Sequence, residues 1–572
     1  MGYIKSVGTV IIYIGFFLAV ITFLPGLPPE AEYSEYSIKF PSDVQLKYET
    51  KTRLQEPEIL FSGEIKGPED IASFNGEIYT GIRGGYVVKI EENRIKPIVK
   101  FGQKCDGLWQ EEKCGRPLGL KFNDNGELFV ADAYYGIFKV NVNTRQYVNI
   151  VNSSEPIDGK TAKIFNTLDI AKNGDIYWTD SSTDFYLHDG MYSFFANPSG
   201  RLIRYNAATK KNEVLIKNLG FPNGVLLSDD ESFVIVGSTL NLKILKYNLK
   251  GPKAGQQEIF IEGLPGLCDN IHSDGQGGFL VSLLAPVDSE HPLLPLSFIP
   301  HPYIRKMISR LIYSIEGPFK LLQDIYPNYY SERVLHTIGS FVVGKYLTLK
   351  TDSLILRMDK TGKILNILYS ENGDVSDISS AHINDGYLWL GSPWNDNIMR
   401  IPLKQAFPDL IINTKSSAGK EQKQKEPLLT VSATPNVKVE AKPMKSTIKQ
   451  DTTKPSSKST IKGQTKQEVN SDTITPKPTS QSTTTSTTTT SKPTSSLPKA
   501  STKEVKKDNL KKTEKDNPTE INKDKFKSQV KSETSKQIND ARSKTKSDDS
   551  VKKDTQSIKS KPVKENEDKT KK

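Results

Sequence analysis

Five oxygen-bearing side chains recur along the chain at intervals that suggest one or two from each repeat of a fold. They are Glu69, Asn166, Asn223, Asp269 and Asn270. Two carboxylates and three amide oxygens suit a hard cation such as calcium, which prefers oxygen ligands. Spacing alone is weak support, because Asn and Asp are also common turn residues that cap loops. The residues by themselves therefore leave both interpretations open, a cation site and ordinary loop capping.

A repeated phrase supplies the elements that would position these side chains. It consists of a Gly-led turn, an alternating apolar strand, a small or polar exit and a second strand. Copies of decreasing clarity begin at Gly76, Gly126, Gly174, Glu231, Gly277 and Asp385. The first copies start about 50 residues apart, which is typical of propeller blades. We predict an all-β fold, a six-bladed β-propeller over residues 58–408, in which loops from several blades line one mouth of the central channel.

The N-terminal segment 1–30 is predicted to be a membrane anchor. Val7 to Leu24 form an uncharged run of 18 residues, with Lys5 before it and acidic residues after it. This length is at the low end for a transmembrane helix, and no A-x-A-like cleavage site follows. We predict an uncleaved type II signal anchor with a linker over residues 31–57, so that the propeller faces the lumen or the cell exterior. The alternatives are a cleaved signal peptide, which would yield a secreted chain, and a buried core helix.

The cysteines and one sequon agree with that compartment. Cys105 and Cys114 flank a polar loop, where a disulfide would form in an oxidising space, while two unrelated thiols are the alternative. Cys268 is left over and is predicted to be a buried small residue. Asn152 begins an Asn-Ser-Ser sequence, a modest signal for N-glycosylation.

The C-terminal tail, residues 409–572, differs in composition from the rest. It is rich in Ser, Thr, Lys and Pro, and Phe526 is its only aromatic residue beyond position 413. It carries roughly +17 of charge, which leaves about −6 for the remainder, given the total of +11. The basic balance therefore describes the tail, and no nucleic-acid partner is predicted for the folded part. We expect a disordered, mucin-like stalk with O-glycosylation on the Thr run, or else an unmodified charged linker.

The spacing between the fifth and sixth copies roughly doubles, which predicts a helical insertion over about residues 287–335, between those two blades. Its apolar residues fall three and four apart and form one stripe: Ile304, Met307, Ile308, Leu311, Ile312 and Ile315. Arg305, Lys306 and Arg310 lie elsewhere on the same helix. The stripe predicts a lid packed on one end of the propeller, and a membrane-interface helix is the second interpretation.

Several phrases carry a family resemblance. CGRPLGLKFNDNGELFVADAYYGIFKVN, FPNGVLLSDDESFVIV, the DNI run and DGYLWLGS resemble the strictosidine-synthase-like propellers. The chain is most similar to their animal membrane-anchored branch, which includes adipocyte plasma membrane-associated protein and hemomucin. The resemblance covers roughly residues 58–403, and the anchor and Thr-rich tail match the hemomucin arrangement.

The resemblance implies a bound calcium ion, because related hydrolases, the paraoxonases and gluconolactonases, hold calcium in the channel. Glu69, Asn166, Asn223, Asp269 and Asn270 look like the paraoxonase ligand set. Thr167 is a departure, since relatives often have Asp after that Asn.

The catalytic positions of the family are altered. Ser379, with Ser380 beside it, occupies the position of the synthase glutamate, and Leu118 that of the paraoxonase histidine. A serine does not exchange protons near neutral pH as a carboxylate does. His272 and His382 remain as bases by residue type, although a lone histidine near a strand is more often structural.

Two functions remain open. The favoured one is a membrane-anchored surface glycoprotein whose propeller binds a glycan, protein or small-molecule partner, with a role in surface recognition or immunity. The alternative is a calcium-dependent hydrolase of aryl esters or lactones. Strictosidine synthesis is not expected, and no catalytic residue is assigned.

Overall fold

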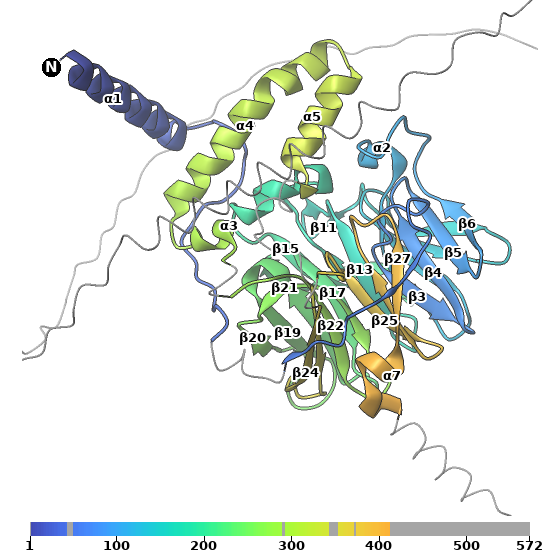
Figure 1. Cartoon of the computed structure of the whole chain (residues 1–572). Coiled ribbons are helices and arrows are strands. Elements are labelled where there is room, and N and C mark those ends of the chain that lie inside the picture. The colour runs from blue at the N-terminus through green and yellow to red at the C-terminus, as the bar shows by residue number, and fades with distance from the viewer. Residues whose placement is uncertain (1, 43–49, 289–291, 343–352, 371–372, 412–572) are drawn as a thin grey trace, which may run out of the picture. The chain divides into compact units, whose positions relative to one another are not determined.

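The fold is known from a computed structural model, which describes residues 2–42, 50–288, 292–342, 353–370 and 373–411. The predicted tail lies outside the described residues beyond position 411. The described residues all belong to the first of two compact units, Met1–Lys438. They form mainly antiparallel sheets with an N-terminal helix and a helical hairpin (Figure 1).

Six sheets of four or five strands make up the body of the described part. The first three are β3 (Ile71–Phe74), β4 (Glu77–Ile82), β5 (Tyr86–Glu91) and β6 (Arg94–Lys100); β7 (Pro117–Phe122), β8 (Leu128–Asp132), β9 (Gly136–Val140) and β10 (Tyr147–Asn152); and β13 (Phe165–Ile170), β14 (Ile176–Asp180), β15 (Gly200–Asn206) and β16 (Lys211–Leu219).

The other three sheets complete the body. They are β17 (Pro222–Leu227), β18 (Phe233–Ser238), β19 (Lys243–Asn248) and β20 (Gln257–Glu262); β21 (Gly266–Ser273), β22 (Phe279–Pro286), β23 (Leu354–Met358), β24 (Ile364–Tyr369) and β1 (Thr50–Lys51); and β25 (Ser380–Asn384), β26 (Tyr387–Gly391), β27 (Ile398–Pro402) and β2 (Glu58–Leu60). A small ribbon of β11 (Pro156–Ile157) and β12 (Lys160–Thr161) lies outside them.

The sheets form a closed ring around a central axis. The innermost strands of neighbouring sheets contact one another in the order β3, β7, β13, β17, β21 and β25, and β25 returns to β3. The ring is fastened by β2, which comes before the first sheet in sequence but pairs antiparallel with β27 in the last. Glu58 and Arg400 face each other in this pairing and form an ion pair of 2.7 Å. The propeller predicted from the repeated phrase is confirmed.

Alternating apolar residues of each phrase are buried between neighbouring sheets. Phe165 of β13 stacks on Trp178 of β14 with ring centroids 4.6 Å apart, and Trp178 is fully buried. Two inner-strand glycines allow the sheets to approach closely. A Cβ on Gly119 would lie 2.5 Å from the carbonyl oxygen of Asn166, and one on Gly224 would lie 2.5 Å from the amide nitrogen of Ile271.

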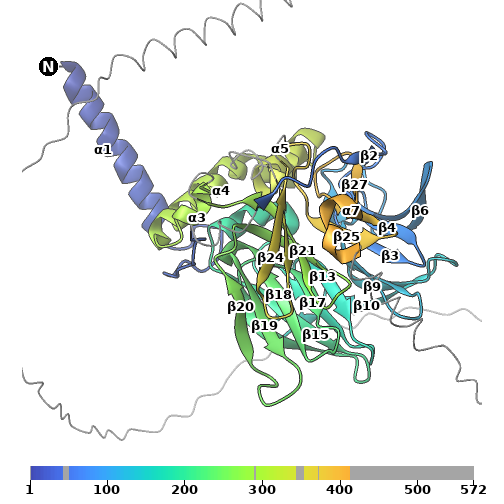
Figure 2. The ribbon, with the colours of Figure 1, turned by 60° about the horizontal axis from the view of Figure 1, so that its bottom comes forward.

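The helical insertion lies inside the fifth sheet, between β22 and β23. This corrects the expectation that it separates two blades. The fifth copy of the phrase has one strand after its Gly-led turn, because the chain leaves the sheet there and returns with β23. The insertion contains α3 (Leu294–Ser297), α4 (Pro302–Ile325) and α5 (Tyr329–Gly339), and α4 packs against α5 (Figure 2).

The remaining helices are short, apart from the N-terminal one. They are α2 (Glu111–Cys114), α7 (Leu403–Ala406) and the 3-10 turns η2 (Leu187–Phe194) and η3 (Thr239–Asn241). The N-terminal α1 (Gly2–Phe23) includes an 18-residue stretch, Ser6–Phe23, that is long and apolar enough to cross a membrane. The side chains of this stretch are mostly exposed, so the alternative of a buried core helix is not supported.

Candidate functional site

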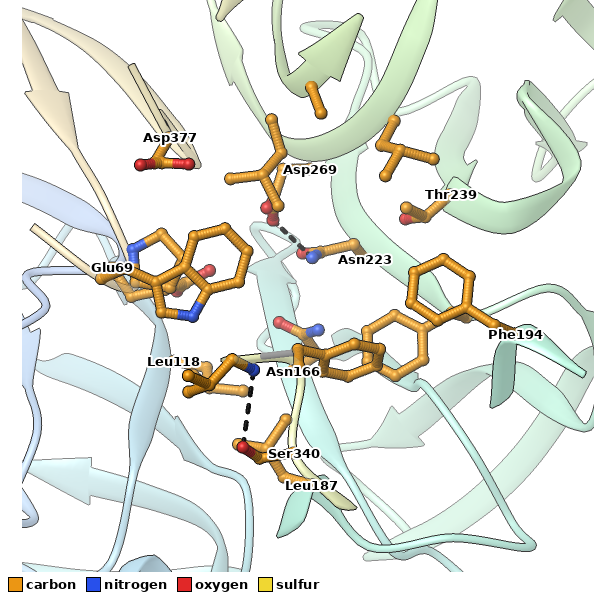
Figure 3. Close-up of a pocket in the computed structure, with 18 of the residues that line it drawn as sticks. Glu69, Leu118, Asn166, Leu187, Phe194, Asn223, Thr239, Asp269, Ser340 and Asp377 are labelled. Carbon is orange, nitrogen blue, oxygen red and sulfur yellow. Dashed lines mark hydrogen bonds between the residues drawn. The ribbon is translucent and has the colours of Figure 1, made fainter. Parts of the chain in front are cut away.

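The five predicted oxygen-bearing residues meet at one end of the central channel. Glu69 immediately precedes the strand pair β3–β4, Asn166 lies on β13, Asn223 on β17, and Asp269 and Asn270 on β21. All five are buried. Figure 3 shows four of them directed toward a common space. The structure thus brings together, from four sheets, every residue predicted for the cation site.

Irregular pairing in the inner strands directs these side chains toward the axis. The register shifts between Phe165 and Leu168 in β13, between Pro222 and Val225 in β17, and between Cys268 and Ile271 in β21. Each shift spans the site residues of its strand. A β-bulge rotates side chains away from the regular alternation, so it can turn a polar residue out of the apolar layer and into the channel.

The hydroxyl group of Thr167 is at the centre of the polar network. It lies 2.8 Å from Oδ1 of Asn270, 3.1 Å from Oδ1 of Asn223 and 3.4 Å from Oδ1 of Asn166. The amide nitrogens of two of these asparagines face carboxylates: Nδ2 of Asn270 donates to Glu69 at 3.1 Å, and Nδ2 of Asn223 donates to Asp269. Nδ2 of Asn166 instead donates to the Ser181 hydroxyl at 3.0 Å. The amide oxygens of Asn223 and Asn270 are thus turned toward Thr167 and away from the two carboxylates.

Burial dominates the electrostatics of the site. It raises the pKa of Glu69 well above its ordinary value, and nearby Asp269 and Asp70 add to the effect, while the Arg116 guanidinium opposes it. Burial, with a contribution from Asp70, also raises the pKa of Asp269, to about 8. Two acids forced together in a dry channel favour protonation or a bound cation. Glu69 Oε2 is buried and has no hydrogen-bond partner among the described residues.

A cation here would need amide ligands as well as carboxylates. In the part of the chain that the structure describes, no three His, Cys, Asp or Glu side chains form a metal-binding group. Rotation of the Asn223 and Asn270 amides by half a turn would point their oxygens at the carboxylates and their nitrogens at the Thr167 hydroxyl. The donor set then fits calcium, and a cation held there would be the partner that Glu69 Oε2 lacks.

A pocket of about 150 Å³ adjoins these polar residues. We call it the channel pocket. Its walls are largely apolar and include Leu118, Leu187, Phe194, Phe221, Leu240 and Leu267. Such a space, with a few convergent oxygens at one end, suits a small molecule that has an apolar body and a polar group.

The α4–α5 hairpin and the segment after it close one side of the channel pocket. His336, Ser340 and Phe341 line it from this side. The Phe341 ring contacts Phe221 with centroids 4.9 Å apart and Phe194 at 5.7 Å. The hairpin is thus present as a lid, but the predicted stripe on α4 does not form its inner surface: Ile304 and Ile315 of the stripe are exposed, and the pocket is lined from α5 and the segment after it.

The predicted disulfide is present and supports this lid. Cys105 is bonded to Cys114, which closes a loop that contains Trp109. Trp109 Nε1 donates to Glu332 Oε2 of α5 at 3.1 Å, and the Trp109 ring meets Tyr329 with centroids 4.8 Å apart. The cross-linked loop therefore holds the start of α5.

The two altered family positions have structural roles. Leu118 on β7 is buried, lines the channel pocket and packs against Ile164 and Ala133. Ser379 is fully buried, and its hydroxyl donates to the backbone oxygen of Glu69 at 2.6 Å. Ser379 therefore fixes the backbone of a predicted cation ligand, Glu69, just before β3.

The two histidines proposed as bases do not join the channel pocket. They line a separate cavity with Asp70 and Lys121. His272 Nε2 is 3.0 Å from Asp70 Oδ1 and 2.8 Å from Ser380 Oγ, while His382 Nε2 is 2.8 Å from Ser73 Oγ. Burial lowers the pKa of His382 to about 3, with a further contribution from His272. Both imidazoles are thus held by polar partners away from the pocket.

His336 was not among the residues predicted from the sequence. It is half-buried on α5, lines the channel pocket, and its Nε2 has no hydrogen-bond partner among the described residues. Burial lowers its pKa, opposed by Glu111, which favours the neutral imidazole. No sequence signal marked it, because it lies in the insertion, outside the repeated phrases.

The remaining predicted positions do not line the pocket. Asn152 is exposed at the end of β10, and its Oδ1 accepts from the Ser154 amide at 3.1 Å. Cys268 is fully buried and unpaired, as predicted. Exposure makes Asn152 sterically accessible to a glycosylating enzyme.

Comparison with known proteins places these features in a family context. Residues 166–252 match the strictosidine synthase family, and residues 47–90 match the strictosidine synthase-like N-terminal region. The adipocyte plasma membrane-associated protein hemomucin of Drosophila melanogaster is 38% identical over 413 residues, which is 71% of this chain and 71% of that protein.

Two further similarities extend the comparison. The adipocyte plasma membrane-associated protein of Salmo salar is 34% identical over 381 residues, 66% of this chain and 84% of the salmon protein. A gluconolactonase structure from Xanthomonas campestris covers 66% of this chain and 99% of its own, at 13% identity and a TM-score of 0.39. That structural likeness is too remote to carry a functional argument.

Proposed function

The chain belongs to the strictosidine-synthase-like propellers, in the branch of adipocyte plasma membrane-associated protein and hemomucin, and from this premise we propose a calcium-bearing, ligand-binding surface protein. In this proposal α1 anchors the chain in a membrane, the channel residues hold calcium, and the channel pocket receives a small molecule. The convergence of five buried oxygen-bearing side chains beside an apolar pocket is the observation that carries it.

The proposed orientation is type II, with the propeller on the lumenal or extracellular side. The Cys105–Cys114 disulfide supports it, because such bonds persist in oxidising compartments. The exposed Asn152 sequon is usable on that side alone. Protease added outside intact cells should digest the propeller or tail; full protection of both in intact cells, with cleavage only after permeabilisation, would refute an extracellular placement.

The proposed calcium ligands are Glu69, Asn166, Asn223, Asp269 and Asn270. Glu69 and Asp269 supply the negative charge, and Asn223 and Asn270 supply amide oxygens after their rotation away from Thr167. Glu69 Oε2 has no partner among the described residues, and both acids have raised pKa values. Both observations are expected of a site whose acids are normally paired with a bound cation. Chelator should lower the unfolding temperature of the full-length protein, and an unchanged temperature at every calcium concentration would oppose the proposal.

We propose that the ligand is a small molecule with an apolar body and an exposed oxygen, such as a carbonyl compound. Leu118, Phe194 and Phe221 would contact the apolar body, and the polar end would face the channel residues. A glycan is a poorer match, because most of the pocket surface is apolar and would desolvate a large share of its hydroxyl groups.

A second candidate function is hydrolysis of an aryl ester or lactone, and His336 favours it. The unpartnered Nε2 of this neutral imidazole is suited to take a proton from water as the water oxygen bonds to the carbonyl carbon. The same proton then passes to the leaving oxygen as its bond to that carbon breaks. A bound calcium ion supplies positive charge that polarises the carbonyl. We do not propose strictosidine-type condensation, because Ser379 is buried and bonded to backbone.

Phenyl acetate and lactone hydrolysis by the full-length protein separate the two candidates. The variants are Asn223→Ala, which removes a proposed ligand, and His336→Gln, which removes the base but keeps a similar size. Asn143→Ala, an exposed asparagine in a loop of the second sheet, is the matched control. Hydrolysis that needs calcium and falls in both test variants supports the enzyme. Absent hydrolysis in a folded, calcium-binding protein excludes it and leaves the binding function.

A further inference from the structure

The helical hairpin is attached to the end of the membrane anchor. Arg310 of α4 is buried, and its Nη1 lies 2.7 Å from the carbonyl oxygen of Ile21, 3.0 Å from that of Thr22 and 2.8 Å from that of Leu24. The last carbonyls of a helix lack partners within it and carry its negative dipole end, so a guanidinium is a suitable cap. Phe23 also contacts Tyr303, with ring centroids 5.3 Å apart.

A second arginine attaches the segment after the anchor to the propeller. Arg305 is fully buried and donates from Nη1 to the carbonyl oxygen of Phe195 at 2.7 Å. Its Nη2 donates to the carbonyl oxygen of Ser34 at 2.5 Å, and its guanidinium lies 4.8 Å from the Tyr36 ring centroid. The anchor, the segment that follows it and α4 are thus joined by side chains and not only by the chain's connectivity.

Ile308 and Ile312 of α4 pack against the core, but the rest of the helix departs from the polarity of an ordinary surface helix. Arg305, Ser309 and Glu316 are buried on the side that faces the protein, where Glu316 Oε2 accepts from the Tyr192 hydroxyl at 2.6 Å. Large apolar and aromatic side chains are instead exposed. They define the outer face of the hairpin: Tyr303, Ile315, Leu321, Leu322, Ile325 and Tyr326.

The exposure on this outer face is large. Ile325 is 74% exposed and Leu321 is 60% exposed. A soluble surface helix normally presents charged and polar residues to water, and a concentrated apolar face marks a contact with something else. The pairing of Ile and Leu with Tyr is typical of segments at the boundary between lipid headgroups and acyl chains.

The position of the face follows from that of α1. In both views α4 runs across the C-terminal end of α1 and not along its side (Figures 1 and 2). The 18-residue apolar stretch of α1 rises about 27 Å, close to the thickness of a bilayer core, so its end lies at the membrane boundary. Arg310 bonds directly to that end, and α4 runs across it, so α4 extends along the membrane boundary.

We propose that the outer face of the α4–α5 hairpin lies in the interfacial layer of the phospholipid bilayer that α1 crosses. The inference rests on α1 as a membrane span, which is part of the proposed function. It extends that function, because the hairpin also closes the channel pocket through His336 and Phe341. The lid of the pocket is then in contact with lipid.

Site-specific fluorescence in nanodiscs tests this placement with the full-length chain. Single cysteines are introduced as Leu321→Cys on the outer face, Ile259→Cys on β20, and Phe17→Cys in α1, and each is labelled with the environment-sensitive dye NBD. Ile259 is a matched control, because it is an aliphatic residue that is 57% exposed, similar to Leu321. The native cysteines do not interfere, since two form the disulfide and Cys268 is buried.

The expected result is a blue-shifted emission at position 321 that nitroxide-labelled phospholipids quench and aqueous iodide does not. At position 259 the emission should not be blue-shifted, and aqueous iodide should quench it whereas nitroxide-labelled phospholipids should not. Quenching by lipid at 17 but by iodide at 321 would overturn the hairpin placement while leaving the anchor intact. Iodide quenching at 17 would instead refute the anchor itself.

A second copy of the chain is the other occupant that could cover the outer face. Nanodiscs loaded with one copy exclude it. Protection from iodide at 321 in single-copy discs supports lipid contact, whereas protection that appears only with two copies would contradict the proposal and identify a dimer interface.

Discussion

Replacement of Thr167 by valine should strengthen calcium binding while weakening the calcium-free fold. The hydroxyl proton of Thr167 satisfies one amide oxygen at a time, and Asn270 at 2.8 Å is the nearest acceptor. Its loss leaves a buried acceptor unpaired, at a cost of about 1 kcal/mol. Calcium binding must also break the bond between the Thr167 hydroxyl and the Asn270 amide oxygen. In Thr167→Val this bond is already absent, so calcium binding no longer has to break it.

The expected changes in calcium affinity and in unfolding temperature both follow from the loss of one hydrogen bond. A relief of about 1 kcal/mol corresponds to roughly a fivefold tighter calcium dissociation constant. The unfolding temperature in chelator should fall by about 2 °C. Both are measured on the full-length protein, the first by calorimetric titration and the second by thermal unfolding with and without calcium.

Thr179→Val provides the matched control. Thr179 is also a buried threonine of the same sheet, but its hydroxyl donates to the backbone oxygen of Asn223 at 2.9 Å. This substitution should lower stability without tightening calcium. Weaker binding in Thr167→Val would show that the hydroxyl is itself a ligand, and unchanged binding would show that it does not compete for the amide oxygens.

Three further outcomes are expected. Because burial lowers the pKa of His382 to about 3, the unfolded chain binds a proton below pH 6.5 that the folded chain does not; stability is therefore full above pH 6.5 and is lost as pH falls. Urea unfolding should show about 2 kcal/mol lost between pH 7 and pH 5, and His382→Gln should flatten that slope. Replacing both Cys105 and Cys114 by serine should accelerate amide hydrogen exchange in α5, with Glu332→Gln giving part of the same effect through Trp109; equal protection in all three proteins would contradict the role of the loop. Asn152→Gln should abolish the mobility shift that a glycan-removing enzyme produces, and an untouched shift would place the glycan elsewhere.

The fold could be predicted from the sequence because the pattern that encodes it is local and recurs along the chain. Each Gly-led phrase encodes a strand, a tight turn and a second strand, and the ring follows from stacking such units. The ligand residues could be predicted because they recur at blade-like intervals, within or just before the inner strand of successive units. Asn166, Asn223 and Asp269 all fall where an inner strand departs from regular pairing.

The misplaced insertion and the missed His336 have a common cause, which is that the hairpin follows no repeat. The fifth copy lacks its second strand after Pro286, and this was the signal that the insertion interrupts a sheet. The position of His336 depends on tertiary contacts, among them Trp109 with Glu332, that no local pattern encodes. The apolar stripe likewise predicted a buried face, whereas Arg305 and Glu316 are buried by specific polar partners.

Calcium titration of chelator-treated, full-length protein in nanodiscs is the measurement that decides whether the channel is a cation site. The wild-type chain should bind one calcium ion with release of protons, because Glu69 and Asp269 have raised pKa values and must ionise. Asp269→Ala should lose this binding while remaining folded. Stoichiometric binding that survives in Asp269→Ala, or no binding by the folded wild-type protein, would contradict the assignment of the channel.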